Sequence, residues 1–171
     1  MPSRLNTTMQ GLYLKSLVVY YTRGGNTRFV AETIAAEIGA DIEEVIDLKK
    51  RSGILGYLSG GRDAWQGKET KISPTIKSSA GYDLIVVGSP IWAGRPAPAI
   101  TTYLKKNDLS DKKVAVFFSQ GGKKITGFRQ AKALMPNSQC IGELSVTQPL
   151  NHKEESEKQI VDWCKTLIAK S

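Results

Sequence analysis

The chain has 171 residues, of which 40% are apolar and 23% charged, and its net charge at pH 7 is +8. This length suits one domain with its own hydrophobic core, and no stretch approaches the roughly 18 apolar residues of a membrane-spanning helix. Residues 1–15 lack the apolar core of a secretory signal. We therefore expect an N-terminal extension over residues 1–15, one domain over residues 16–171, and no membrane partner.

The cysteines and the single histidine give no sign of a metal or thiol site. Cys140 and Cys164 are not spaced as CxxC, and His152 has no cysteine near it in the sequence. We expect no metal ligand, and reduced thiols indicate a cytoplasmic protein. Cys164 is expected to pack in the core on one face of the last helix, together with Ile160, Val161, Leu167 and Ile168.

The excess of positive charge is spread along the chain rather than clustered. Because no nucleic-acid-binding motif accompanies it, we expect no nucleic-acid partner. An anionic ligand or acidic protein partners fit the charge better.

The first strand, turn and helix form a candidate phosphate site. The apolar run 17–21 is typical of a strand buried on both faces of a parallel sheet, and helical apolar spacing over residues 29–38 follows. Unpaired amides and the helix dipole at such a turn attract anions. The alternative is an ordinary turn capped by Asn26. The turn consists of Thr22, Arg23, Gly24, Gly25, Asn26 and Thr27.

A second strand is expected over residues 41–46, and residues 47–81 are less regular. Apolar residues over 54–65 indicate a short helix interrupted by Gly60-Gly61. We expect Trp65 to pack against the protein rather than to contact a ligand.

The run 84–87 predicts another strand, which ends in a second glycine-containing turn. Pro90 keeps this turn from being helical at its start, Gly94 permits a bend, and Pro96 and Pro98 suit the entry to a helix. We expect Trp92, held on this stiff loop, to cover the flat face of a ligand. The turn consists of Ser89, Pro90, Ile91, Trp92, Ala93 and Gly94.

A third polar turn follows the strand predicted over residues 114–118. Its residues are Ser119, Gln120, Gly121 and Gly122. A helix is expected over residues 125–135, where Pro136 stops it, and a weaker strand over residues 140–146. Asn151 and Glu154 have the spacing of a capping box for the last helix.

Five strands alternating with helices predict an α/β fold: a doubly wound three-layer sandwich with a five-stranded parallel sheet. In such sheets ligands bind beyond the carboxyl ends of the strands, where the strand order reverses. Three polar turns after strands, one suited to an anion and one carrying an aromatic ring, indicate a ligand with a phosphate and a planar ring system.

The three turns resemble those of the flavodoxin family, and the resemblance covers roughly residues 16–168. It implies a flavodoxin-like fold and an FMN cofactor, with residues 22–27 as the phosphate loop and residues 89–94 and 119–122 flanking the flavin. Trp92 stands in the family's aromatic place. The family commonly has a hydroxyl residue where Gly24 stands, and often an aromatic residue in the second flanking loop, where this chain has none.

The resemblance implies an electron carrier between redox partners, a role that needs no catalytic acid, base or nucleophile. Electron-carrying flavodoxins are usually acidic, whereas this chain is basic, so acidic partners are expected. One alternative is an FMN-dependent NAD(P)H or quinone oxidoreductase, in which Arg95, Lys123 or Lys124 holds an anionic nucleotide. A second is a flavin-free binding module on the same fold. The sequence leaves the oligomeric state open, and it does not decide whether the irregular segment 53–72 contributes to a substrate pocket or to a dimer contact.

Overall fold

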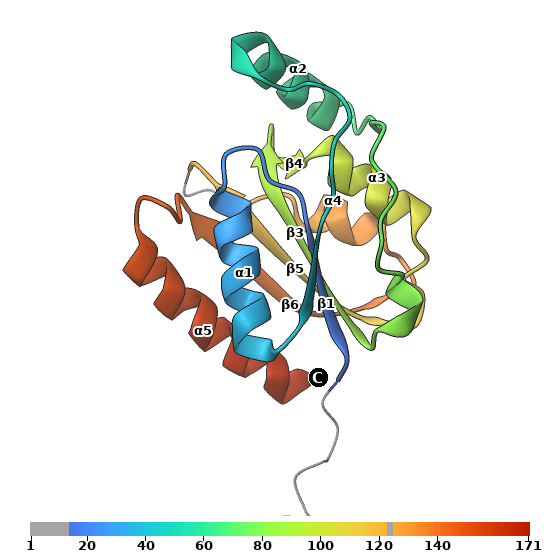
Figure 1. Cartoon of the computed structure of the whole chain (residues 1–171), viewed down its shortest axis with the longest axis vertical. Coiled ribbons are helices and arrows are strands. Elements are labelled where there is room, and N and C mark those ends of the chain that lie inside the picture. The colour runs from blue at the N-terminus through green and yellow to red at the C-terminus, as the bar shows by residue number, and fades with distance from the viewer. Residues whose placement is uncertain (1–13, 123–124) are drawn as a thin grey trace, which may run out of the picture.

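Five parallel strands form the central sheet of the computed structural model, which describes residues 14–122 and 125–171 (Figure 1). The strand order is β2-β1-β3-β5-β6, and every neighbouring pair on this path is parallel. This confirms the predicted sheet and matches the flavodoxin-like order. The strands are β1 (Ser16–Tyr20), β2 (Asp41–Glu44), β3 (Leu84–Trp92), β5 (Lys113–Gln120) and β6 (Gln139–Thr147).

Helices cover both faces of the sheet (Figure 1). On one face, α1 (Asn26–Ile38) and α5 (Lys153–Lys170) pack on the side chains of Val18 and Tyr20. On the other, α3 (Pro98–Lys106) and α4 (Phe128–Ala133) pack with Leu17 and Val19. Because neighbouring strand residues point to opposite faces, β1 is buried on both sides, and it is free of charged residues and apolar or aromatic from Leu17 onward.

The helix α2 (Gly53–Trp65) lies outside these layers, across the edge formed by the carboxyl ends of the strands (Figure 1). The predicted interruption at Gly60-Gly61 is wrong, because the helix runs through both glycines. Its buried residues are Gly56, Gly60 and Ala64, so the helix approaches its neighbours through small side chains. The packing prediction for Trp65 is also wrong, since 66% of this residue is exposed.

Two helix boundaries differ from the sequence prediction. Helix α4 spans only Phe128–Ala133, because the chain turns before Pro136, a residue that disfavours helix just ahead of it. The capping box of α5 is absent: His152 precedes the helix without a side-chain cap bond. The Asn151 side-chain amide instead donates to Gln148 Oε1 at 3.0 Å.

The last helix confirms the buried position of Cys164, which packs with Ile160 and Leu167. Val161 is half-buried and Ile168 is 55% exposed, so the buried face of α5 is narrower than the sequence predicts. Among the described residues, no helix is long and apolar enough to cross a membrane.

Candidate functional site

A cavity of about 910 Å³ opens at the carboxyl ends of β1, β3 and β5. It brings together parts of all three predicted turns. Of the predicted site residues, Gly25, Ser89, Gly94 and Gly122 do not line it. The lining consists of Thr22, Arg23, Gly24, Asn26, Thr27, Tyr57, Leu58, Gly61, Arg62, Pro90, Ile91, Trp92, Ala93, Ser119, Gln120, Gly121, Gln148 and Asn151.

The first turn is held in shape by Thr22 and Gly25. The Gly25 N–H donates to Thr22 Oγ1 at 3.0 Å, and Gly25 has φ +87°, which favours glycine. Gly25, rather than Asn26, occupies the cap position of α1. Asn26 Oδ1 instead accepts from the Leu150 N–H at 3.2 Å. The turn therefore presents the start of α1 to the cavity, and the Thr22 hydroxyl, whose oxygen accepts from Gly25, can donate its hydrogen to a ligand.

A buried hydroxyl pair joins the first and third turns. Thr27 Oγ1 lies 2.7 Å from Ser119 Oγ, and both residues are buried while lining the cavity. Since α1 follows β1 and Ser119 lies in β5, this contact fixes the spacing between the first and third turns.

The second turn is a hairpin rather than an open loop. β3 continues to Trp92 and pairs antiparallel with β4 (Arg95–Pro96). The two residues between them, Ala93 and Gly94, both have positive φ, of 49° and 76°, as in the two-residue turns that join hairpin strands. Ser89 is buried beneath the hairpin, where its Oγ accepts from the Ala97 N–H at 2.9 Å. Ser89 thus supports the turn from behind.

Trp92 lines the cavity and is also held by the protein. Tyr21 meets the Trp92 ring edge-on, with centroids 5.7 Å apart. The Arg51 guanidinium lies 5.8 Å from the Trp92 ring centroid. A Cβ at Gly60 would come within 2.9 Å of the indole, so α2 packs directly on it. These contacts fix the orientation of the ring beside the cavity.

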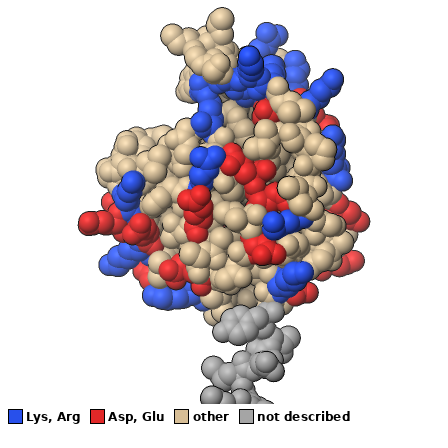
Figure 2. All heavy atoms as spheres, viewed as in Figure 1, with Lys and Arg blue, Asp and Glu red and all other residues tan. Residues whose placement is uncertain are grey.

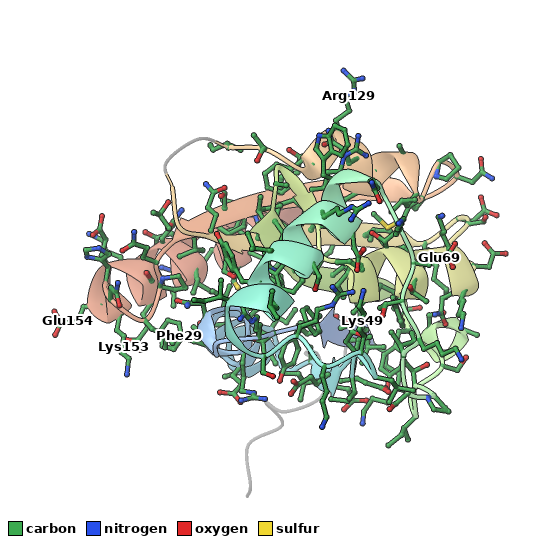
Figure 3. All side chains as sticks on the ribbon, turned by 90° about the horizontal axis from the view of Figure 1, so that it is seen from above. Phe29, Lys49, Glu69, Arg129, Lys153 and Glu154 are labelled. Atoms are coloured by element: carbon green, nitrogen blue, oxygen red, sulfur yellow. The ribbon has the colours of Figure 1, made fainter. Side chains whose placement is uncertain are left out.

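One wall of the cavity comes from α2, a segment whose role the sequence left open between a substrate pocket and a dimer contact. Figure 3, seen from above, shows this helix crossing in front of the other elements. Tyr57, Leu58, Gly61 and Arg62 form this wall. Their i and i+4 spacing places 57 with 61, and 58 with 62, on one side of the helix, which is the signal that could have found them. Tyr57 supplies an aromatic ring that the third turn lacks.

Arg23 connects the first turn to α2. Its Nη2 donates to the Gly53 carbonyl at 3.0 Å, and its guanidinium lies 5.6 Å from the centroid of the Tyr57 ring. Arg28, the next arginine after this turn, does not line the cavity and pairs with Glu44 at 2.8 Å. The positive charge at the first turn is therefore that of Arg23.

The third turn is braced by the segment after β6. The Gln148 side-chain amide donates to the Gly121 carbonyl at 2.8 Å, and the Gln148 N–H donates to the Gln120 carbonyl. Gln148 and Asn151 thereby reach the cavity, a role that sequence reasoning did not assign to them. The predicted nucleotide-holding residues Lys123 and Lys124 lie outside the described residues.

A buried ion cluster anchors α2 next to Trp92. Arg51 Nε donates to Asp47 Oδ2 at 2.6 Å, and Arg51 Nη1 donates to Asp63 of α2 at 3.1 Å. Lys49 also bonds Asp63, at 2.7 Å. Burial acts to raise the pKa of Asp63, but the hydrogen bonds from Lys49 and Arg51 outweigh it, so this pKa lies below its ordinary value.

The charges around the cavity favour an anionic ligand. Arg23 and Arg62 are the cations among its described lining residues, and that lining contains no carboxylate. Hydroxyl groups of Thr22, Thr27 and Ser119 add polar contacts. Apolar and aromatic surface comes from Trp92 on the hairpin and from Tyr57 and Leu58 on α2.

The comparisons agree with this geometry. The flavodoxin family model matches residues 15–167. A flavoprotein from Lactobacillus acidophilus NCFM, solved in complex with FMN, is 27% identical, with 81% of this chain and 97% of that chain covered and a TM-score of 0.68.

Two further solved structures share the fold. A putative flavoprotein from Bacteroides uniformis is 22% identical over 88% of this chain and 97% of that chain, with a TM-score of 0.71. Oxidised flavodoxin 2 from Bacillus cereus is 19% identical over 92% of this chain and 99% of that chain, with a TM-score of 0.57. No curated protein matches the sequence. Because the family model spans most of the sequence, the chain belongs to the flavodoxin family.

Proposed function

We propose that this protein binds FMN in the cavity and transfers electrons between redox partners. The observation that carries the proposal is the division of the lining into a polar, cationic side at the first turn and an aromatic side at Trp92 and Tyr57. FMN has a phosphate at one end and a planar ring system at the other. The FMN complex of the Lactobacillus flavoprotein supports the same ligand.

In this proposal the phosphate is bound by residues 22–24, 26 and 27, where the start of α1 and Arg23 favour an anion. Residues 90–93 and 119–121 contact the flavin ring. Bound FMN supplies the redox chemistry, and the protein's residues bind and orient it. Gly25, Ser89, Gly94 and Gly122 shape the loops from outside the lining.

The visible absorption spectrum tests this proposal. Purified protein titrated with FMN is expected to show a flavin spectrum altered by binding, and the released chromophore is identified by mass. Thr22→Ala is expected to weaken FMN binding more than riboflavin binding, because riboflavin lacks the phosphate. Thr33→Ala, in α1 but outside the cavity, serves as the control. Equal losses for both ligands would refute the phosphate assignment, and a protein that binds no FMN would support the flavin-free module.

The α2 wall favours a second candidate, an FMN-dependent NAD(P)H or quinone oxidoreductase. Tyr57, Leu58 and Arg62 provide a mixed aromatic, apolar and cationic surface for a second planar substrate. Steady NAD(P)H consumption by the FMN-loaded protein, with a quinone as acceptor, would favour the enzyme. Its absence, with FMN bound, would leave the carrier.

The net charge of +8 supports acidic redox partners. Complex formation with an acidic redox protein should weaken as salt is raised, because salt screens the attraction. The cytoplasmic location expected from the thiols is part of the same proposal.

A further inference from the structure

Helix α2 is reversed relative to an ordinary amphipathic helix. It buries Gly56, Gly60 and Ala64, and it turns its large apolar side chains outward. We call four of these side chains the α2 ridge. The ridge consists of Ile54 (80% exposed), Leu55 (82%), Leu58 (60%) and Trp65 (66%). Ile54, Leu58 and Trp65 follow one another at four and seven residues, so they lie along one line of the helix.

The orientation of α2 is fixed by its buried face. A Cβ at Gly56 would overlap the backbone of Arg51, and a Cβ at Gly60 would press on Trp92. Asp63 is bonded to Arg51 and Lys49. Rolling the helix to bury the ridge would break these contacts and drive large side chains into positions that only glycine fits. The ridge therefore stays outside.

Basic side chains accompany the ridge. Lys50 precedes the helix by three residues, Arg62 lies within it, and Lys68 follows it by three residues, and all three are exposed. Figure 2 shows the ridge end of the molecule as an uncharged projection with Lys and Arg at its base. The helix has a single acidic residue, Asp63, which is already paired. The surroundings of the ridge thus attract anions.

We propose that the α2 ridge docks this protein onto the surface of membranes that contain anionic lipids. The apolar side chains enter the boundary between headgroups and acyl chains, and Lys50, Arg62 and Lys68 contact the headgroups. The sequence prediction of no membrane partner followed from the lack of a spanning segment. A helix that lies in the interface needs no such segment.

Shape and charge favour a lipid surface over the two protein alternatives. A second copy would bring the same cations face to face across the ridge. An acidic protein would need a groove matched to a convex projection, in which Ile54 is 80% and Leu55 82% exposed. A lipid surface deforms around such a projection and supplies negative charge around it.

The position of α2 connects docking with the cavity. Leu58 belongs to the ridge and also lines the cavity, and Tyr57 beside it on the same helix lines the cavity as well. A docked α2 therefore brings the cavity close to the headgroups. The link between this placement and electron transfer rests on the proposed function, whereas the docking of α2 on a membrane does not depend on it.

Vesicle flotation tests the proposal with the full chain. Protein is mixed with vesicles of equal parts phosphatidylcholine and phosphatidylglycerol, or of phosphatidylcholine alone. We expect flotation with the anionic vesicles, and weaker flotation with neutral vesicles or at high salt. The I54S/L55S variant changes ridge residues outside the cavity lining and should bind the anionic vesicles at least about tenfold more weakly. K50E/K68E should also bind them more weakly.

The matched control is I168S, which removes an exposed isoleucine from α5, whose end lies at the opposite pole from α2 (Figure 1). It should float like the unchanged protein. Failure to float with anionic vesicles, or equal flotation of I54S/L55S, would overturn the proposal. So would a dimer in sedimentation velocity that I54S/L55S dissociates without any vesicle binding. FMN titration of each variant separates the two proposals, since docking is expected with and without flavin.

Discussion

Thr27 and Ser119 share a buried hydroxyl contact of 2.7 Å that joins the start of α1 to the end of β5. Thr27→Val leaves the Ser119 hydroxyl buried without this partner, and Ser119→Ala does the same to Thr27. Each change should lower the free energy of unfolding by about 1–3 kcal/mol. The double variant should lose less than the sum, because it removes both unpaired hydroxyls.

Chemical denaturation of the four proteins measures this coupling. Thr33→Val is the control, because the Thr33 hydroxyl donates to the Phe29 carbonyl of its own helix. Thr33→Val and Ser119→Ala should be additive. If the losses in the free energy of unfolding caused by Thr27→Val and Ser119→Ala also add up in the double variant, the contact contributes nothing to stability.

Alanine substitutions at two adjacent glycines of α2 should change the stability of the protein in opposite directions. Gly60→Ala places a Cβ within 2.9 Å of Trp92 and should destabilise the protein by about 1–3 kcal/mol through overpacking. A Cβ at Gly61 meets nothing within 4 Å, so Gly61→Ala should stabilise the helix by about 0.5–1 kcal/mol. Thermal unfolding distinguishes them, and equal shifts would contradict the packing of α2 on Trp92.

Asp63→Asn should weaken the attachment of α2 in a pH-dependent way. The pKa of Asp63 is lowered in the folded protein from its ordinary value of 3.8, so its stabilisation is present above that value and is lost as pH falls through the folded pKa. The free energy of unfolding should differ most between wild type and variant at neutral pH. Denaturation measured from pH 7 to pH 3 should show the difference shrinking, and a difference independent of pH would refute this role.

Tyr103→Phe should leave stability unchanged or raise it by up to about 1 kcal/mol at pH 7. The Tyr103 hydroxyl is buried, with no hydrogen-bond partner among the described residues, so its removal takes away an unsatisfied group. Burial and the charge of Glu43 raise the pKa of Tyr103 to about 12. Since the unfolded chain ionises near pH 10 and the folded protein only near pH 12, Tyr103 lowers the free energy of unfolding as pH rises from 10 to 12 and has no such pH effect below that range.

Alkaline denaturation provides the second readout for Tyr103. The unchanged protein should lose stability more steeply between pH 10 and pH 12 than Tyr103→Phe does. Parallel curves would mean that Tyr103 is not the buried titrating group.

Gly24→Ser should restore the hydroxyl that flavodoxins commonly have at this place. Gly24 has no positive φ, and a Cβ there meets nothing within 4 Å, so serine fits without strain. One added hydrogen bond of about 0.5–1.5 kcal/mol should tighten FMN binding by about two- to tenfold and leave riboflavin binding unchanged. Gly25→Ser is the contrasting variant, because φ +87° strains serine, and it should weaken binding.

The sequence by itself determined the strand-helix alternation and the three turns that meet at the cavity. These features are local: apolar runs such as 17–21 identify buried strands, and glycines and prolines identify the turns. The parallel sheet then follows from the handedness of the crossovers. The strand order β2-β1-β3-β5-β6 places those turns together, as the family resemblance implied.

Only the tertiary structure decided the role of α2. Its glycines predicted an interruption in isolation, because glycine weakens a helix, yet Gly56 and Gly60 are the residues that let the helix pack against Arg51 and Trp92. The same packing exposes Trp65 and puts Tyr57 into the cavity wall. Gln148 reached the third turn through contacts between segments distant in sequence. Such contacts depend on which surfaces meet after folding, and a local sequence pattern does not predict which surfaces those are.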